Sequence, residues 1–304
     1  MNKVLITGGS GFIGNRLVRY LDNKKISIVL LSRSHETVFE TIICDLKSDL
    51  IPENSMLGID TVFHLAAQTH DTRSDLIMAQ EYIKINVDAS IKLAELAIKS
   101  GVKRFVFISS VKAGGSAIKG QYLTEKNQGE PEGVYGRTKR EAELKLLKMS
   151  LKSGMDVSIL RPSLVYGPNV KGNLELMMNG IRKGWFPSIP NVHNKRTMIH
   201  VDDLVVAIIL VAKDDRAKGE IFNVTDGEVH STREVYESMC HMLKKRKSFF
   251  SLPKFFFTFL SFLSPKFKYK VDKLFGDELY SSKKIESIGF KPKLSLKEMN
   301  ETSF

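Results

Sequence analysis

Cysteine and tryptophan are scarce in this chain of 304 residues, which has two cysteines, Cys44 and Cys240, and one tryptophan. Two cysteines are too few for a disulfide-stapled secreted domain, so we expect reduced thiols. The seven histidines lack the paired spacing typical of metal ligands, and no metal site is expected. The first residues run directly into an apolar segment and leave no room for a signal peptide. These absences favour a cytoplasmic protein.

Acidic residues are also in short supply, with 34 Asp and Glu against 46 Lys and Arg, a net charge of +12. No DNA-reading motif accompanies the excess, so nucleic-acid binding is not expected. Eight of the twelve excess positive charges lie in residues 241–304, and within this stretch residues 248–270 interleave phenylalanines with lysines. That segment is either a helix packing its phenylalanines inward or a peripheral contact with anionic lipid at the inner face of a membrane. Pro253 and Pro265 enclose too few residues for the ~20 that span a bilayer.

A glycine-rich stretch, TGGSGFIG at residues 7–14, stands between a short apolar run and an amphipathic segment. Glycines at a strand-to-helix turn are typical of pyrophosphate binding. Gly8 allows the tight turn, Gly11 lets the phosphates approach, and Gly14 lets the helix lie close to its strand. Free amides at the helix start, including those of Phe12 and Ile13, then bind the anion.

Apolar strand-like runs alternate with helical patterns along most of the chain. We expect strands at residues 3–7, 27–31, 41–44, 61–64, 104–109, 157–161 and 221–224, and long helices at 75–100 and 133–153. Such alternation predicts an α/β Rossmann fold, a doubly wound parallel sheet, with a smaller C-terminal substrate domain. We assign residues 1–165 and 197–227 to a cofactor domain and residues 166–196 and 228–304 to the substrate domain.

Five further motifs follow the glycine turn in a fixed order: CDL at 44–46, HLAA at 64–67, Ser109-Ser110, YGRTK at 135–139 and RPSLVYGP at 161–168. Together they resemble the extended short-chain dehydrogenase/reductases, the NAD-dependent epimerase/dehydratase family of nucleotide-sugar enzymes. Residues 170–173 and 193–204 are most similar to bacterial UDP-4-keto-6-deoxy-N-acetylhexosamine 4-reductases and to UDP-sugar 4-epimerases. The resemblance implies a UDP-sugar substrate, bound by the C-terminal domain, and a homodimer.

Three side chains are expected to carry the chemistry: Ser110, Tyr135 and Lys139. Tyr135 and Lys139 are four residues apart in an expected helix, so they share one face. A phenol ionises near pH ~10, and a neighbouring ammonium favours the phenolate, so Tyr135 can exchange a proton with the oxygen at sugar C4. Ser110, at the end of an expected strand, hydrogen-bonds the same oxygen. By resemblance, Lys139 also holds the nicotinamide ribose.

The residues after Ser110 narrow the reaction. Family 4,6-dehydratases have Asp-Glu there, whereas this chain has Val111-Lys112, which disfavours dehydration. The subgroup resemblance favours 4-keto reduction in the synthesis of a surface polysaccharide precursor. The alternative is 4-epimerisation with retained NAD, on a UDP-sugar or a polyprenyl-diphosphate-linked sugar. A non-catalytic cofactor sensor is a second alternative, although sensors usually lose the Tyr-Lys pair kept here.

The cofactor is expected to be NADP or NAD. The second strand ends in Ser32-Arg33 without an acidic residue for the ribose, and Arg33 suits a 2′-phosphate, which favours NADP; Glu36 remains an alternative ribose ligand. By resemblance, Asp45 and Leu46 contact adenine. The other cofactor residues so assigned are Leu65, Ala66, Ala67, Asn86 and Pro162.

For the substrate, two residues match the family pattern: Arg196, whose guanidinium fork suits a diphosphate, and Asn173 near the same group. Family enzymes carry another phosphate-binding arginine near the C-terminus. Here only Lys270 or Lys273 stands near that place, and a point charge replaces the fork.

Overall fold

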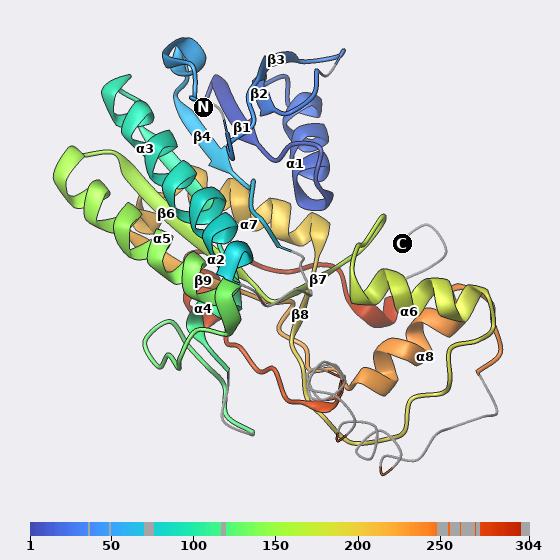
Figure 1. The fold of residues 1–304 in the computed structure, drawn as a ribbon. Coiled ribbons are helices and arrows are strands. Elements are labelled where there is room, and N and C mark those ends of the chain that lie inside the picture. Colours follow the sequence, from blue (N-terminus) through green and yellow to red (C-terminus); the bar gives the residue numbers. More distant parts are fainter. Residues whose placement is uncertain are drawn as a thin grey trace.

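Seven parallel strands form the central sheet of the computed structural model, in the order β3-β2-β1-β4-β5-β6-β9 (Figure 1). The structure describes residues 1–35, 37–48, 50–69, 76–116, 120–247, 255, 262, 271 and 274–298. The strands are β1 Lys3–Thr7, β2 Ser27–Ser32, β3 Glu40–Ile43, β4 Thr61–His64, β5 Arg104–Ile108, β6 Asp156–Pro162 and β9 Glu220–Val224. This is the order of a dinucleotide-binding fold with one strand added beside β6.

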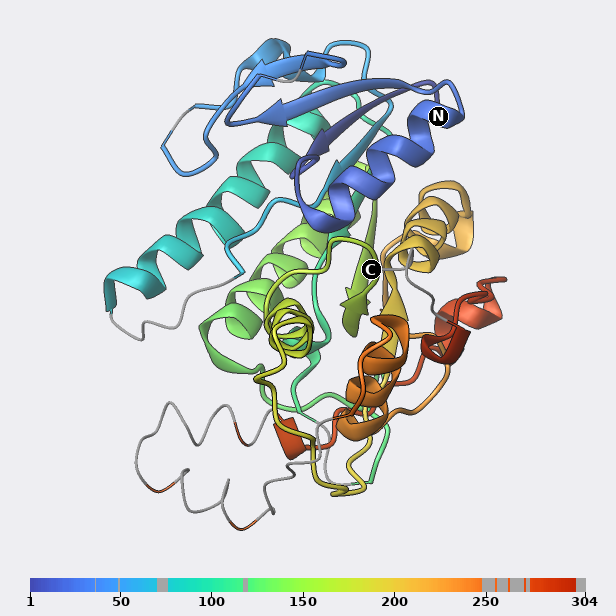
Figure 2. The same ribbon diagram turned by 90° about the vertical axis from the view of Figure 1, so that its right-hand side faces the viewer.

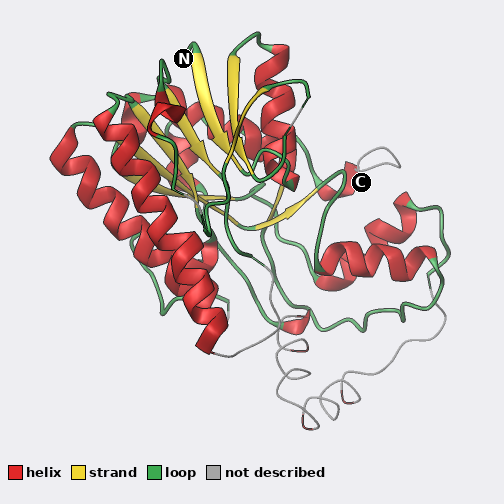
Figure 3. Ribbon diagram, turned by 45° about the horizontal axis from the view of Figure 1, so that its top comes forward, coloured by secondary structure: helices red, strands yellow, loops and turns green. Residues whose placement is uncertain are grey.

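Helices cover both faces of this sheet (Figure 3). One face carries α1 Phe12–Asn23, α7 Val201–Lys213 and α11 Lys283–Ser287; the other carries α2 Leu76–Ile83, the π-helix η2 Lys84–Asp88, α3 Ala89–Lys99 and α5 Gly133–Ser153. Since side chains alternate along a strand, Val4 and Ile6 enter the first core and Leu5 the second. Burial on both faces explains why the strands are nearly continuous apolar runs.

The strand order reverses at β1, which pairs with β2 on one side and β4 on the other. Thr7, the last residue of β1, is in register with Leu31 of β2 and His64 of β4. In open α/β sheets, ligands bind outside the carboxyl ends of the strands at such a reversal. The glycine turn leaves β1 at this point.

A smaller lobe stands away from the sheet, as Figures 1 and 2 show. It contains α6 Asn173–Arg182 and α8 Thr232–Met242, next to the parallel pair of β7 Leu164–Tyr166 and β8 Met198–His200. An apolar core of its own holds these elements together, formed by residues such as Tyr166, Met177, Met178, Tyr236 and Met239.

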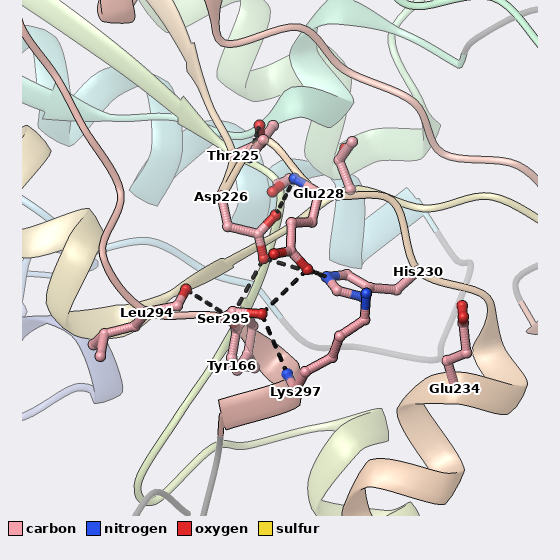
Figure 4. A network of polar contacts seen from close by, with 12 residues as sticks. Tyr166, Thr225, Asp226, Glu228, His230, Glu234, Leu294, Ser295 and Lys297 are labelled. Atoms are coloured by element: carbon pink, nitrogen blue, oxygen red, sulfur yellow. Dashed lines mark hydrogen bonds and ion pairs between the residues drawn. The ribbon is translucent and has the colours of Figure 1, made fainter.

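A polar network fastens the C-terminal segment to this lobe (Figure 4). The Tyr166 hydroxyl donates to Asp226 Oδ2 and to the Leu294 carbonyl oxygen, each at 3.3 Å. Ser295 Oγ donates to Glu228 at 3.1 Å. Burial, with the nearby Asp226 charge, raises the pKa of Tyr166 above its usual range, so its phenol stays a donor.

The expected α/β fold with a doubly wound parallel sheet is confirmed. The long helix expected at 75–100 is described from Leu76 and is interrupted by η2, which the sequence pattern did not indicate. Residues 248–270, assigned to an inward-packing helix or a lipid contact, lie almost wholly outside the described residues. In the described part of the chain, no helix is long and apolar enough to cross a membrane. The boundaries of the two domains stay a prediction.

Candidate active site

The glycine turn has the geometry of a phosphate site. Gly8 has a φ of +72°, and a Cβ there would lie 2.8 Å from the Ala66 nitrogen. A Cβ on Gly14 would overlap the Gly8 carbonyl oxygen, whereas one on Gly11 would meet only that oxygen, at 3.1 Å. Helix α1 starts after Gly11 without a side-chain cap, so its first amides suit an anion. The turn fits a dinucleotide pyrophosphate.

The segment after β4 is held beside this turn by buried hydrogen bonds. The Ala66 amide donates to Thr7 Oγ1 at 3.1 Å, and that oxygen lies 2.6 Å from His64 Nδ1. His64 Nε2 lies 2.8 Å from Ser90 Oγ, which fixes the other side of the ring. Burial lowers the pKa of His64 to about 3, with repulsion from Lys139 adding to the effect. His64 is therefore a neutral structural residue here.

The three expected catalytic side chains converge in one cleft at the carboxyl ends of β5 and β6. Ser110, Tyr135 and Lys139 all line it. Four residues assigned to the cofactor line the same cleft: Ile13, Leu65, Ala67 and Pro162. Sequence positions from 13 to 162 are thus brought together beside the glycine turn.

The Tyr135 phenol and the Ser110 hydroxyl both line this cleft. Burial raises the pKa of the Tyr135 phenol above its usual range, the neighbouring Tyr82 phenol and the Glu143 charge add to this, and the nearby Ser110 hydroxyl acts in the opposite direction. Ser110 Oγ also accepts the Lys112 amide at 3.3 Å, as the N-cap of the short helix α4 Val111–Gly114. The Ser110 hydroxyl is therefore fixed by the helix that follows it.

Lys139 lies one helical turn beyond Tyr135 and is buried. Its Nζ donates to the Ile108 carbonyl oxygen at 2.8 Å and stands 4.3 Å from the centre of the Phe107 ring. Burial lowers the pKa of Lys139 to about 7. The expected lowering of the Tyr135 pKa by a neighbouring ammonium does not occur among the described residues, because burial of the phenol prevails. A bound oxidised nicotinamide would add positive charge beside the phenol.

Asn86 connects two chain segments that contribute residues to the cleft. It lies in η2, and π-helical turns are frequent at functional sites. Its Oδ1 accepts the Gln68 amide at 2.8 Å, and its Nδ2 donates to the Gln68 carbonyl at 3.2 Å and to Thr138 Oγ1 at 3.1 Å. The amide thus ties the segment after β4 to α5, and its assigned contact with the cofactor stays a prediction.

The residues assigned to the adenosine half lie at the ends of β2 and β3. Ser32 ends β2, and Arg33 follows it with its side chain exposed. Asp45 Oδ1 accepts the Lys47 amide at 3.0 Å, which shapes the turn, and Leu46 packs against the core. Glu36, the alternative ribose ligand, lies outside the described residues.

The residues assigned to the substrate lie on the smaller lobe. Arg196 pairs through its backbone with His230 and Glu278, and its guanidinium is 3.8 Å from the Glu278 carboxylate. Asn173 is the first residue of α6 and is exposed. Neither residue lines the cleft of Ser110 and Tyr135. Lys270 and Lys273 lie outside the described residues.

Comparison with known proteins decides the family. The sequence model of the "NAD dependent epimerase/dehydratase family" matches residues 4–225. The chain belongs to this family. It is also 33% identical over 97% of its length to UDP-glucose 4-epimerase of Vibrio cholerae, covering 92% of that protein.

Two further similarities agree with this membership of the epimerase/dehydratase family. The chain is 26% identical to N-acetyl-alpha-D-glucosaminyl-diphospho-ditrans,octacis-undecaprenol 4-epimerase of Escherichia coli O157:H7, over 95% of this chain and 90% of that protein. The structure of MoeE5 in complex with UDP-glucose and NAD superposes with a TM-score of 0.78 at 27% identity, covering 98% and 95% of the two chains. The expected enzyme with a nicotinamide dinucleotide cofactor is confirmed at this level.

Two residues adjacent to Ser110 and Lys139 were assigned no role from the sequence. Ser109, beside Ser110, lines the cleft with a buried Oγ that has no hydrogen-bond partner among the described residues. Arg140, next to Lys139, donates from Nε to the Ala113 carbonyl at 2.5 Å and from Nη2 to the Gly129 carbonyl at 3.2 Å. Adjacency to Ser110 or Lys139 is the only sequence signal for these two residues, because Ser109 Oγ has no described partner and the carbonyl partners of Arg140 lie 27 and 11 positions earlier.

Proposed function

We propose that this enzyme is a UDP-sugar 4-epimerase that retains its nicotinamide cofactor through the reaction. The observation that carries oxidation–reduction chemistry at C4 is the convergence of Ser110, Tyr135 and Lys139 in one cleft at the glycine turn. Val111, where a dehydratase has its acid, is buried against Leu123 and Tyr280. A cleft without that acid supports chemistry confined to C4.

The relatives support epimerisation over the 4-keto reduction that the motifs favoured. Similarity to UDP-glucose 4-epimerase of Vibrio cholerae extends over nearly the whole length of both chains. MoeE5, similar over the same extent, is described with UDP-glucose and NAD. Both reactions use one set of catalytic side chains, so the comparison of whole chains carries the choice.

In this reaction Tyr135 removes the proton of the C4 hydroxyl, and Ser110 holds that oxygen by a hydrogen bond. A nicotinamide cofactor held at the glycine turn would supply reversible hydride transfer at C4. Tyr135 then returns the proton to the oxygen, so the enzyme ends each turnover unchanged. Lys139 stabilises the phenolate while Tyr135 carries the negative charge.

Reduction of a UDP-4-keto-6-deoxy-N-acetylhexosamine is the second candidate, and one feature favours it. The end of β2 presents Ser32 and Arg33 without an acidic neighbour among the described residues, which suits NADP. A reductase needs fresh reductant at each turnover, and NADPH commonly fills that role. A lipid-linked sugar is the third candidate, supported by the relative from Escherichia coli O157:H7.

One set of assays separates these candidates. The purified enzyme, with its cofactor released and identified, is given UDP-glucose or UDP-N-acetylglucosamine without reductant, and separately the 4-keto-6-deoxy sugar with NADPH or NADH. We expect interconversion of C4 epimers without added reductant. Turnover only with the keto sugar and reductant would make the enzyme a reductase.

Tyr135→Phe tests the role of the phenol. We expect kcat to fall by roughly two to four orders of magnitude because the proton has no carrier. UDP binding, measured by calorimetry, should stay unchanged, since UDP lacks the sugar. A Tyr135→Phe enzyme with more than a tenth of the activity would exclude Tyr135 as the acid-base residue.

A further inference from the structure

Four chain segments form a continuous backbone ladder between the two lobes. Isolated bridges join His230 to Arg196, Arg196 to Glu278, and Tyr280 to Leu123. The Leu123 amide donates to the Leu279 carbonyl at 3.0 Å, and the Ser281 amide donates to the Leu123 carbonyl at 2.9 Å. The segment of residues 277–281 thus connects the residues around Arg196, which precede β8, to the loop of Leu123, which follows α4.

The other edge of residues 277–281 is fastened to the Arg196 strand just as closely. The Thr197 amide donates to the Glu278 carbonyl at 2.9 Å, and the Glu278 amide donates to the Lys195 carbonyl at 2.8 Å. The Tyr280 amide donates to Thr197 Oγ1 at 3.2 Å. A displacement of the Arg196 strand therefore moves Glu278 and Tyr280 with it.

Tyr280 reaches both ends of α4, the single turn that Ser110 caps. Its buried ring packs with Val111, the first residue of α4, and with Leu123. Its hydroxyl donates to the carbonyl of Gly115, just after the last residue of α4, at 3.3 Å. One side chain from the C-terminal segment thus sets where α4 lies.

The opposite side of α4 rests on α5, the helix that carries Tyr135. A Cβ on Gly136 would lie 2.5 Å from the Lys112 carbonyl oxygen, so the two backbones are in direct contact. Arg140 adds a bond to the Ala113 carbonyl. Helix α4, and with it the Ser110 hydroxyl, lies between α5 and Tyr280.

We propose that Tyr280 is a positioning residue, which couples binding of a nucleotide diphosphate at Arg196 to the placement of Ser110 against Tyr135. The identity of that ligand rests on the proposed function; the contacts do not. The Arg196 guanidinium faces the Glu278 carboxylate at 3.8 Å. A diphosphate competes for that guanidinium, which shifts Glu278 and, two residues on, Tyr280.

Hydrogen exchange of residues 111–116, with and without UDP, tests the coupling independently of turnover. In the wild-type enzyme we expect UDP to slow exchange in these residues. Tyr280→Phe keeps the ring but loses the bond to Gly115, so it should bind UDP with a Kd within twofold of wild type and lose that protection. Its kcat should fall about tenfold with little change in KM, because substrate binds but Ser110 is misplaced.

Tyr166→Phe is the matched control, since it also removes a buried phenol hydroxyl from the smaller lobe, but one bonded to Asp226 and Leu294 (Figure 4). It should keep the UDP-dependent protection of residues 111–116. Equal protection in Tyr280→Phe and wild type, or equal loss in Tyr166→Phe, would overturn the coupling alone. Failure of UDP to bind the wild-type enzyme would instead refute the proposed function, and the coupling with it.

Discussion

Lys139 is an ionisable residue in a place where charge is costly. Its side chain is 1% exposed, and burial lowers its pKa to about 7. An unfolded lysine ionises near pH ~10.4, so between these values the unfolded chain binds a proton that the folded chain does not. The free energy of unfolding therefore rises as the pH increases from about 7 toward ~10.4. Below pH about 7, the cost of burying the charged Lys139 ammonium is fully present.

Replacement of Lys139 by methionine removes this pH dependence. Urea unfolding at pH 6 and pH 9 should show wild type gaining stability relative to Lys139→Met at the higher pH. Lys145→Met changes an exposed lysine of the same helix, paired with Glu141 at 2.8 Å, and should show no such gain. A Lys139→Met difference that is constant with pH would contradict the shifted pKa.

Gly11 and Gly14 stand three residues apart, and we expect replacement of Gly11 to weaken cofactor binding and replacement of Gly14 to lower stability. Gly14→Ala places a methyl group on the Gly8 carbonyl, so we expect a loss of about 2–3 kcal/mol of stability without any ligand. Gly11→Ala meets only one backbone oxygen, so it should fold and bind NAD or NADP at least tenfold more weakly. Thermal unfolding and calorimetric titration measure the two effects; equal loss of affinity and stability in both variants would argue against separate roles.

At the scale of elements, a buried ion pair joins α5 to β6. Arg161 donates from Nε to Glu143 Oε1 at 2.8 Å, and both side chains are at most 1% exposed. Removing one partner leaves an uncompensated charge in a dry interior, whereas replacing both with apolar residues does not.

Arg161→Met should therefore cost about 3–5 kcal/mol of stability, while the double variant Arg161→Met with Glu143→Leu should recover most of it. Denaturant unfolding measures both. The single change Glu220→Gln, at an exposed pair with Lys284, is the comparison and should change stability by less than about 1 kcal/mol. A double variant as unstable as Arg161→Met would show that shape, not charge, matters at this position.

The pattern of apolar residues predicted the strands well, because each buried strand is a continuous apolar run. It predicted poorly those features that depend on contacts between residues far apart in the sequence. Strands β1, β2 and β4 were predicted within one residue, because each is an apolar run ended by a turn. The π-helix η2 was not, since its register change accompanies the bonds of Asn86 to Gln68 and Thr138. No sequence signal joins Leu123 to Tyr280, 157 positions apart, yet their pairing sets the loop after Ser110.

At the scale of the whole molecule, the motifs predicted the family and the sheet because they occur in a fixed order along one fold. They predicted the cleft for the same reason: Ser110, Tyr135 and Lys139 follow β5 and begin α5. The arrangement of the smaller lobe was harder to predict. Arg196 is placed by backbone pairing with Glu278 and His230, which depends on how the C-terminal segment crosses the lobe.

The homodimer implied by the family resemblance remains a prediction, and the outer face of α5 offers the place for it. Leu144 and Leu151, seven residues apart and therefore on one side of the helix, are 61% and 89% exposed. The helix lies beside α3 on one flank of the sheet, away from α6 and α8 of the smaller lobe (Figure 1). Two such flanks would bury both leucines against a second copy of the chain.

Changing both leucines to glutamate should then convert a dimer to a monomer at micromolar concentration, because charge would be buried at the interface. Sedimentation velocity gives the mass of each form. Leu176→Glu is the matched control, since Leu176 is exposed to 62% on α6 in the other lobe and should leave the dimer intact. A monomeric wild-type enzyme would show that this dimer does not form. Dissociation by Leu176→Glu alone would place the dimer contact on α6 instead.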